Sequence, residues 1–208
     1  EQCAFLGIPL SLIGGKMVKD LRGKWEGLTG PVSAEEFVLE HFKNMGAQGL
    51  ACEGNAQSAW QMAMHSRFQQ RTGLMPGFER VNGKLVPETP SDESALLYID
   101  ALRDVRVDIE GEYKSRQRYY DKLWRVSFED MRTFADIVGW ELLEKIAYMF
   151  RRHGVGGGWP DITMRLNGNV RFVEVKVKDR LRGSQARWVR DIAKPLGLDV
   201  SVVQLEAV

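Results

Sequence analysis

Apolar and polar positions along the chain recur with a helical period in several segments. After Ser33, apolar side chains follow at helical spacing until Gly46, and Glu36 completes a capping box with Ser33. Similar patterns predict helices over about residues 56–71, 92–104 and 112–125, from 127 onward, from 139 to 153, and over 185–194. Helices are therefore expected to dominate the middle of the chain.

A tight β-hairpin is predicted near the C-terminal quarter. Two short, mostly apolar runs, 162–166 and 170–173, are joined by Asn167-Gly168, which is the strongest local signal for a two-residue hairpin turn. Runs at 49–53 and 199–205 predict two further strands, and the turn-rich segment 73–90 predicts a loop or a small hairpin. Residues 1–31 are interrupted by glycines and predict only a packed N-terminal segment.

The hairpin brings candidate chemistry to one end of the sheet. Asp161 precedes its first strand and Glu174 ends its second, so the two carboxylates are expected to meet, with Lys176 on the same face as Glu174. Such a group suits a divalent cation and an activated water. A Glu-x-Lys pattern alone is more often a solvated face. The glycine run 156–158 and Pro160 beside it favour the functional interpretation, because they let the backbone pass close to a ligand.

Composition narrows the class of protein without naming a function. The chain of 208 residues is 44% hydrophobic and 27% charged, which is typical of one sizeable globular domain, and its net charge is only +1. Residues 151–208 hold 11 Lys/Arg against 6 Asp/Glu, whereas residues 1–150 hold 18 against 22. The basic character is therefore concentrated around the predicted site, as a phosphate-binding surface requires. Two cysteines give neither a disulfide framework nor a metal-binding spacing.

The motif residues resemble a known nuclease family. Gly158-Trp-Pro-Asp161, Glu174-Val-Lys176, Asp179-Arg-Leu181 and Gln185 are similar to the VRR-NUC domain, a PD-(D/E)XK nuclease found at the C-terminus of the Fanconi-associated nuclease. The resemblance implies an α/β fold with a restriction-endonuclease-like αβββαβ core. On this basis we expect a single nuclease domain whose core spans about 33–54 and 155–206. A largely helical insertion would span about 55–153, and an N-terminal extension 1–32.

The resemblance also implies a role for each motif residue. Asp161, Glu174 and the carbonyl of Val175 would bind Mg²⁺ or Mn²⁺, since hard cations prefer oxygen ligands. Lys176 would act on the attacking water, and Gln185 would support the site by hydrogen bonding. Glu53, in a Glu-Gly pair, is expected to be a further metal ligand. Glu35 and Glu36 are the alternatives, because the wider superfamily often takes a glutamate from its first helix; capping already explains Glu36.

Basic side chains near the motif are candidates for contact with DNA. We expect this role for Arg180, Arg182, Arg187 and Arg190. A second basic segment, with Lys16, Lys19, Arg22 and Lys24, fits a solvated face better than a DNA contact.

Three functional hypotheses follow. The first is a metal-dependent deoxyribonuclease that processes branched DNA in repair. The second is the toxic nuclease domain of a bacterial effector, delivered into the cytoplasm of a target cell and paired with an immunity-type inhibitor protein. The third is a catalytically inactive nuclease fold that binds DNA or acts as a scaffold. The chain begins at Glu1 rather than at methionine, so a piece of a longer protein is expected.

Overall fold

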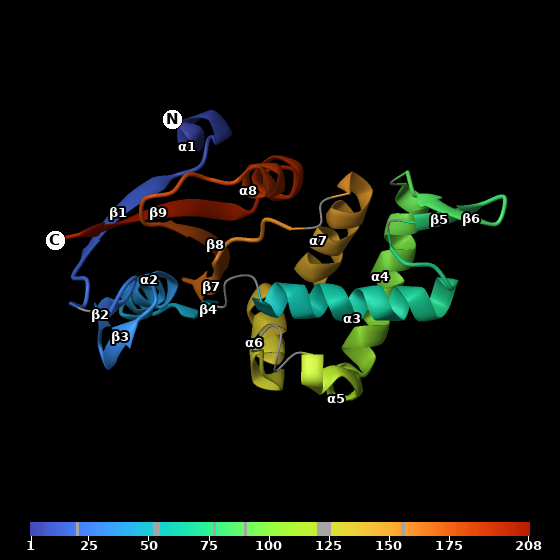
Figure 1. Cartoon of the computed structure of the whole chain (residues 1–208), viewed down its shortest axis with the longest axis horizontal. Helices are drawn as coiled ribbons and strands as arrows, with labels where there is room; N and C mark the ends of the chain where they lie inside the picture. The colour runs from blue at the N-terminus through green and yellow to red at the C-terminus, as the bar shows by residue number, and fades with distance from the viewer. Residues whose placement is uncertain (20, 52–54, 77, 90, 120–125, 155–156) are drawn as a thin grey trace. The chain divides into compact units, whose positions relative to one another are not determined.

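The computed structural model describes residues 1–19, 21–51, 55–76, 78–89, 91–119, 126–154 and 157–208. The chain divides into two compact units, each of which is described by itself (Figure 1). The first unit comprises Glu1–Gly54, Asp136–Val138 and Gly157–Val208, and the second comprises Asn55–Ala135 and Gly139–Gly156. Glu53, one of the predicted metal ligands, lies outside the described residues.

The first unit is built on a five-stranded sheet with the strand order β1-β9-β8-β7-β4. These strands are β1 (Leu10–Gly15), β4 (Gln48–Ala51), β7 (Ile162–Leu166), β8 (Asn169–Lys176) and β9 (Asp199–Ala207). β1, β9 and β8 run parallel, whereas β7 is antiparallel to both β8 and β4. The sheet is therefore mixed, with its parallel half at the β1 edge.

The order of elements in this unit confirms the predicted fold class. Helix α2 (Ala34–Lys43) precedes β4, the hairpin β7–β8 follows, and helix α8 (Gly183–Trp188) leads to β9, which is an αβββαβ order. Helix α8 continues as a short π-helix, η2 (Val189–Ala193). Three N-terminal elements precede this core besides β1: α1 (Gln2–Leu6), β2 (Trp25–Gly27) and β3 (Gly30–Val32).

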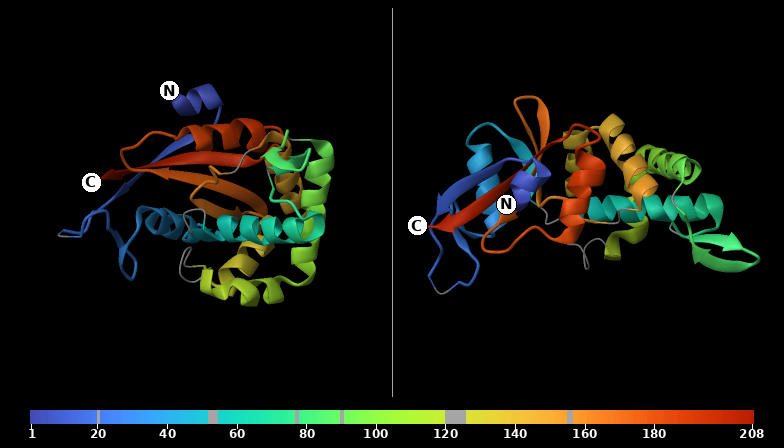
Figure 2. Two further views of the ribbon diagram at one scale, coloured as in Figure 1. Left: turned by 45° about the vertical axis from the view of Figure 1, so that its right-hand side comes forward. Right: turned by 90° about the horizontal axis from the view of Figure 1, so that it is seen from above.

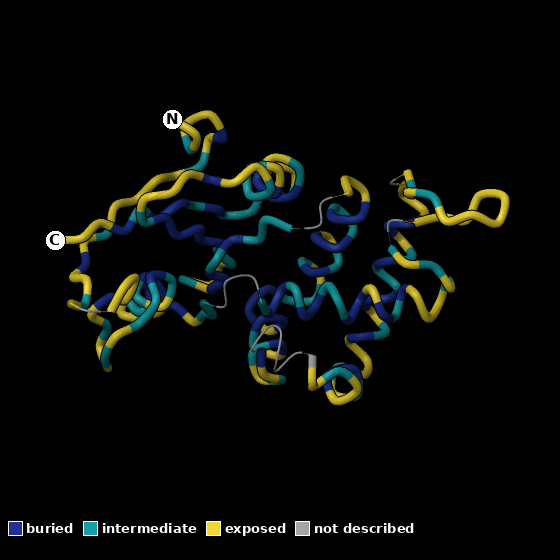
Figure 3. Tube along the Cα trace, viewed as in Figure 1, coloured by how far each residue is buried: buried dark blue, intermediate teal, exposed yellow. Residues whose placement is uncertain are grey.

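The two faces of the sheet are covered by different helices. Val38 and Phe42 of α2 belong to one buried cluster with Val175 and Val203 of the sheet. Phe172 points to the opposite face, where its ring lies 5.4 Å from that of Trp188 in α8. Figure 3 shows the central strands of this unit as mostly buried between these layers. The sheet is thus a rigid support for side chains at its strand ends.

The predicted hairpin is confirmed in position and register. Asn167 and Gly168 have φ values of 52° and 82°, as a two-residue turn with positive φ at both positions requires. Ile162 pairs with Val173, so Asp161 lies opposite Glu174 at the open end of the hairpin. Turn chemistry therefore sets the relative position of the two carboxylates.

The second unit is mainly helical. Its elements are α3 (Asn55–Thr72), α4 (Asp92–Val107), α5 (Ile109–Tyr119), most of α6 (Phe128–Val138), α7 (Trp140–His153) and the hairpin of β5 (Phe78–Val81) and β6 (Lys84–Pro87). The carboxylate of Glu112, 2% exposed, lies between Arg67 at 3.0 Å and Arg116 at 2.9 Å, so a buried charge is paired on both sides. None of the described helices combines the length and the apolar character that a membrane crossing needs.

Candidate active site

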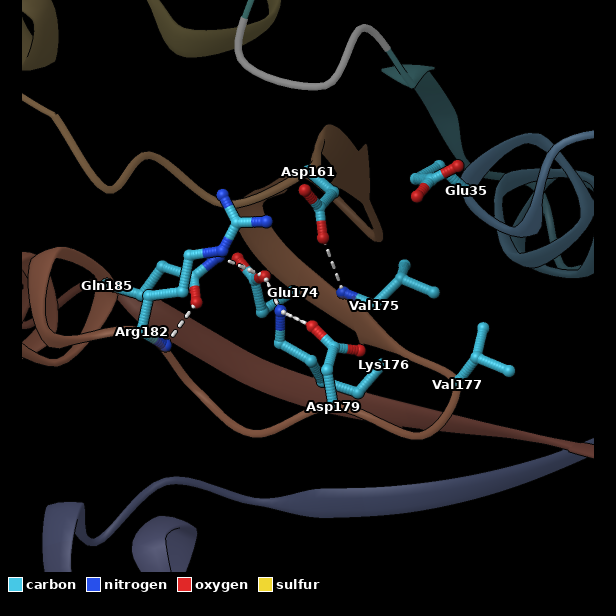
Figure 4. A pocket seen from close by; sticks show the side chains of 9 residues that line it. All are labelled: Glu35, Asp161, Glu174, Val175, Lys176, Val177, Asp179, Arg182 and Gln185. Carbon is cyan, nitrogen blue, oxygen red and sulfur yellow. Dashed lines mark hydrogen bonds and ion pairs between the residues drawn. The ribbon is translucent and has the colours of Figure 1, made fainter. Parts of the chain in front are cut away.

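A pocket in the first unit gathers the predicted motif residues. It has a volume of about 350 Å³ and is lined by Glu35, Asp161, Glu174, Val175, Lys176, Val177, Asp179, Arg182 and Gln185 (Figure 4). Helix α2, the start of β7, the C-terminal half of β8, the loop after it and helix α8 each contribute to the wall. Six of the nine residues are charged, so the pocket suits a polar or ionic ligand.

Asp161 is held by the neighbouring strand. Its Oδ2 accepts a hydrogen bond from the backbone N–H of Val175 at 2.9 Å. The chain reaches this position through Gly158, which has a φ of +89°, and a Cβ atom there would collide with the backbone carbonyl of Ser184. A glycine is therefore required at position 158, because the segment before Asp161 passes directly against the start of α8.

Lys176 connects two carboxylates. Its Nζ lies 2.7 Å from Oε1 of Glu174 and 3.2 Å from Oδ2 of Asp179. The side chains of Lys176 and Glu174 are only 7% and 4% exposed, whereas that of Asp179 is 60% exposed. The ammonium is therefore fixed at the boundary between the interior and the pocket.

Gln185 and the loop after β8 complete the support of Glu174. The side-chain amide of Gln185 donates a short hydrogen bond to Oε1 of Glu174, and its carbonyl oxygen accepts from the backbone N–H of Arg182 at 2.7 Å. The amide of Gln204 donates to the carbonyl of Val177. The hydrogen bond from Gln185 thus links helix α8 to the carboxylate of Glu174 in β8.

The electrostatics of the pocket are dominated by the removal of its carboxylates from solvent. Burial raises the pKa of Glu174 to about 8, and the nearby charge of Asp161 adds to the rise. Burial also raises the pKa of Asp161, which the Val175 amide only partly offsets. For Lys176, burial by itself would lower the pKa, but its hydrogen bond to Glu174 and the charges of Glu174 and Asp179 hold it above its ordinary value. One ammonium therefore faces the buried carboxylate of Glu174 and the half-buried carboxylate of Asp161, and each is costly to ionise.

The donors in the pocket fit a divalent cation. Oε2 of Glu174 is buried and has no hydrogen-bond partner among the described residues. A cation there would satisfy this oxygen and lower the cost of ionising both Glu174 and Asp161. Within the described ranges, no three Asp, Glu, His or Cys side chains converge closely enough to form a metal site by themselves. Asp161 and Glu174 would thus supply only part of a ligand shell.

Glu35 extends this acidic surface from helix α2. Its half-buried side chain lines the pocket, whereas the adjacent Glu36 is exposed and accepts the Ser33 N–H at 2.8 Å as a helix cap. Of the two alternatives in the first helix, the structure thus brings Glu35 to the pocket. The sequence feature that indicated Glu35 is its position in the first turn of the capped helix.

The predicted DNA-binding arginines are distributed unevenly. Arg182 lines the pocket, and Arg180 and Arg187 are exposed outside its described lining. The guanidinium of Arg190 lies 2.6 Å from Asp191, which compensates its charge. Asp179, which the sequence indicated only as part of the motif, is an additional pocket residue, and its contact with Lys176 depends on the path of the loop.

Comparison with known proteins identifies the fold. No protein-family model matches the sequence, and no curated protein is similar enough in sequence to be matched. Two crystal structures of paFAN1 are similar, one bound to 5′-flap DNA with a 2-nucleotide flap and a gap, the other with a 1-nucleotide flap and a gap. Their sequence identities are 20% and 19%, and each has a TM-score of 0.58.

The similarity covers 97% of this chain and 38% of the paFAN1 chain in each structure, so the chain spans well under half of the length of that protein. Coverage of this extent includes most of the helical unit as well as the sheet. The predicted resemblance to the VRR-NUC nuclease of the Fanconi-associated nuclease is therefore confirmed at the level of the fold.

Proposed function

We propose that this chain is a divalent-metal-dependent deoxyribonuclease that hydrolyses phosphodiester bonds in branched DNA. The convergence of Asp161, Glu174 and Lys176 in one pocket carries the proposal, because phosphodiester hydrolysis needs carboxylate ligands for a cation and a fixed positive charge. The pocket lies in a fold similar to that of a protein crystallised with flap DNA.

Different residues of the pocket would bind the metal ion and orient the attacking water. Asp161, Glu174 and the carbonyl of Val175 would hold Mg²⁺ or Mn²⁺, with Glu35 and the predicted ligand Glu53 as further donors. When bound, such an ion supplies positive charge that stabilises the charge developing on the phosphate. Lys176 orients the attacking water by donating from its Nζ.

The reaction balances as a hydrolysis. The water oxygen forms a bond to phosphorus, the bond from phosphorus to the departing sugar oxygen breaks, and the proton lost by the water is finally balanced by the proton that the departing oxygen gains. Gln185 keeps the carboxylate of Glu174 in place throughout, because its amide donates to Oε1. The buried Lys176 ammonium, which Glu174 already holds at 2.7 Å, offsets charge in the transition state.

Branched DNA is the substrate class that we favour. The similarity to paFAN1, in its complexes with flap DNA, extends over 97% of this chain. It therefore includes most of residues 55–153, the predicted helical insertion. A role as a toxin with an immunity-type inhibitor remains a second proposal without a structural observation that favours it.

The test compares isosteric variants on defined substrates. The wild type, Asp161→Asn and Glu174→Gln are incubated with a gapped 5′ flap, the matching linear duplex and single-stranded DNA, in Mg²⁺, Mn²⁺, Ca²⁺ or chelator. Glu206→Gln is the matched control, because Glu206 is an exposed carboxylate of β9 in the same unit and lines no part of the pocket. Binding of the flap is measured in parallel, together with the melting temperature of each variant.

We expect the wild type and Glu206→Gln to cut the flap in Mg²⁺ or Mn²⁺ and to be inactive in chelator. Asp161→Asn and Glu174→Gln should still bind the flap but should not cut it. Undiminished cutting in excess chelator would exclude the metal-dependent mechanism. Binding without cutting by the wild type under every condition would instead support the inactive scaffold.

A further inference from the structure

A second cationic surface lies in the first unit, in the loop between β1 and β2. Lys16, Lys19, Arg22 and Lys24 all have exposed side chains. None of them takes part in an ion pair with another described residue. Asp20, the acid within this stretch, lies outside the described residues. The sequence thus carries four cations against one acid between positions 16 and 24, which is the type of surface that attracts a polyanion.

The loop is fixed at both ends. Val18 N–H donates to the carbonyl of Lys24 at 3.0 Å, and Met17 forms a β-bridge with Trp25. Trp25 is 1% exposed and belongs to the buried cluster beneath α2. On the other side, Gly15 passes so close to Trp25 and Phe37 that a Cβ atom there would collide with Phe37. The cations are therefore presented from an anchored loop, which lowers the entropy cost of binding.

The position of the loop relative to the pocket follows from the strand register. β1, β9 and β8 are parallel, so their C-terminal ends lie at one edge of the sheet. Lys176 pairs with Gln204, whereas Gly15 pairs with Ala207, three residues further along β9. This offset is about 10 Å along the strands, and two strand spacings add about 10 Å across them. The loop therefore starts roughly 14 Å from Lys176, and it extends beyond the sheet in both views of Figure 2.

We infer that the loop of residues 16–24 is a second DNA contact, which binds the phosphate backbone of the substrate away from the cleaved bond. This inference rests on the proposed function. On one strand of duplex DNA, phosphates are spaced by about 3.4 Å along the axis, so a separation of about 14 Å corresponds to about four base steps. The loop would hold the DNA while the pocket acts on one phosphodiester, and it contacts phosphates rather than bases, so it carries no sequence preference.

An anionic membrane is the rival partner. Met17 and Leu21 are 43% and 47% exposed beside the cations, and basic segments with exposed apolar residues also bind lipid surfaces. DNA is favoured because the loop lies at the same edge of the sheet as the pocket. A nucleic acid bound in the pocket would extend along this edge to the loop. Vesicles of anionic lipid therefore belong in the test.

The experiment compares two double variants with the same loss of charge. Lys19→Gln/Arg22→Gln removes two cations of the loop, and Lys43→Gln/Lys194→Gln removes two exposed cations elsewhere in the same unit. Binding to a flap substrate is measured in chelator across a range of salt concentrations. The single-turnover cleavage rate is measured at saturating DNA with metal. The substrates have either about ten or about two base pairs of duplex on each side of the cut.

The measured quantity is the slope of the logarithm of the binding constant against the logarithm of the salt concentration. We expect the loop variant to reduce the magnitude of this slope by about two, because each lost phosphate contact contributes roughly 0.9. The control variant should keep the wild-type slope. All three proteins should have similar single-turnover rates at saturating DNA, and the difference in binding should vanish on the short substrates.

Equal slopes for the loop variant and the wild type, or equal losses in the two double variants, would overturn the inference. Binding to anionic vesicles that the loop variant loses, with an unchanged slope on DNA, would assign the loop to a membrane. These outcomes leave the proposed function intact if the wild type still cuts flap DNA. Failure of the proposed function is recognised separately, since the wild type would then not cut any substrate.

Discussion

The ammonium of Lys176 lies 2.7 Å from the carboxylate of Glu174, although both side chains are almost entirely buried. On a sheet face, an acid and a lysine two residues apart normally remain in solvent. Here the pair lines a pocket together with Asp161. Two carboxylates face one lysine, and a divalent cation would favour the ionised form of both.

Lys176→Met tests the catalytic part of this arrangement. The variant keeps the apolar stem of the side chain and deletes its charged end, so the single-turnover cleavage rate should fall by about 10²–10³, or roughly 3–4 kcal/mol. Affinity for DNA should change little. Lys178→Met is the matched control, since Lys178 is exposed and is not among the lining residues of the pocket. Melting temperatures are measured on the same preparations, and a destabilised Lys176→Met variant with a wild-type rate would leave Lys176 with a structural role only.

The stability of the metal-free protein should fall as the pH rises. The pKa of Glu174 is about 8 in the folded protein against an ordinary value of 4.5, so between these values the folded state holds a proton that the unfolded state has released. The contribution of Glu174 to the free energy of unfolding is therefore largest at low pH. It decreases by about 1.4 kcal/mol per pH unit between the two pKa values. Denaturant titrations in chelator between pH 5 and 8 measure this slope.

Two controls separate this effect from the other titrating groups. Glu174→Gln should flatten most of the slope, whereas Glu206→Gln should retain it. Saturating Mn²⁺ should also reduce the loss of stability at high pH, because a cation favours the ionised carboxylates. A wild-type slope in Glu174→Gln would assign the pH dependence to other groups.

Glu35 and Glu36 provide a pair of neighbouring residues with different predicted roles. Glu35 lines the pocket, so Glu35→Gln should lower cleavage on the order of tenfold or more by weakening metal binding. Glu36→Gln should retain activity, because glutamine can replace glutamate in the capping box. Cleavage rates across a titration of Mn²⁺ decide the matter. Identical profiles for the two variants would remove Glu35 from the acidic site.

Gly158→Ala should disturb both the fold and the site. The substitution places a Cβ against the backbone of Ser184 at a positive φ, and we expect a loss of roughly 2–4 kcal/mol in the free energy of unfolding. Gly157→Ala is the control, since a Cβ there meets no described atom within 4 Å. Denaturant midpoints of both variants give the comparison. A Gly158→Ala protein as stable as the control would show that the contact with α8 is not required.

Several features of the fold are fixed by short-range sequence signals. Asn167-Gly168 adopts the backbone angles that its hairpin requires, and Ser33 with Glu36 caps the first long helix as predicted. Both depend only on residues within a few positions of one another, so local chemistry is sufficient. The type of turn also sets the register of the hairpin. The position of Asp161 opposite Glu174 could therefore be predicted from the sequence alone.

Other features depend on contacts between segments that are distant in the sequence, so short-range patterns could not predict them. β1 had no clear sequence pattern, since it is a glycine-containing edge strand whose partner, β9, lies at the other end of the chain. Glu35 reaches the pocket because α2 packs against the sheet. Lys176 is buried because α8 and the loop after β8 close over it, and the link from Gln185 to Glu174 arises from the same packing. Short-range sequence patterns were sufficient to identify the candidate site residues and the way in which the hairpin pairs them. The packing of helices on the sheet determines their burial, and burial is the main cause of the raised pKa values of Asp161 and Glu174.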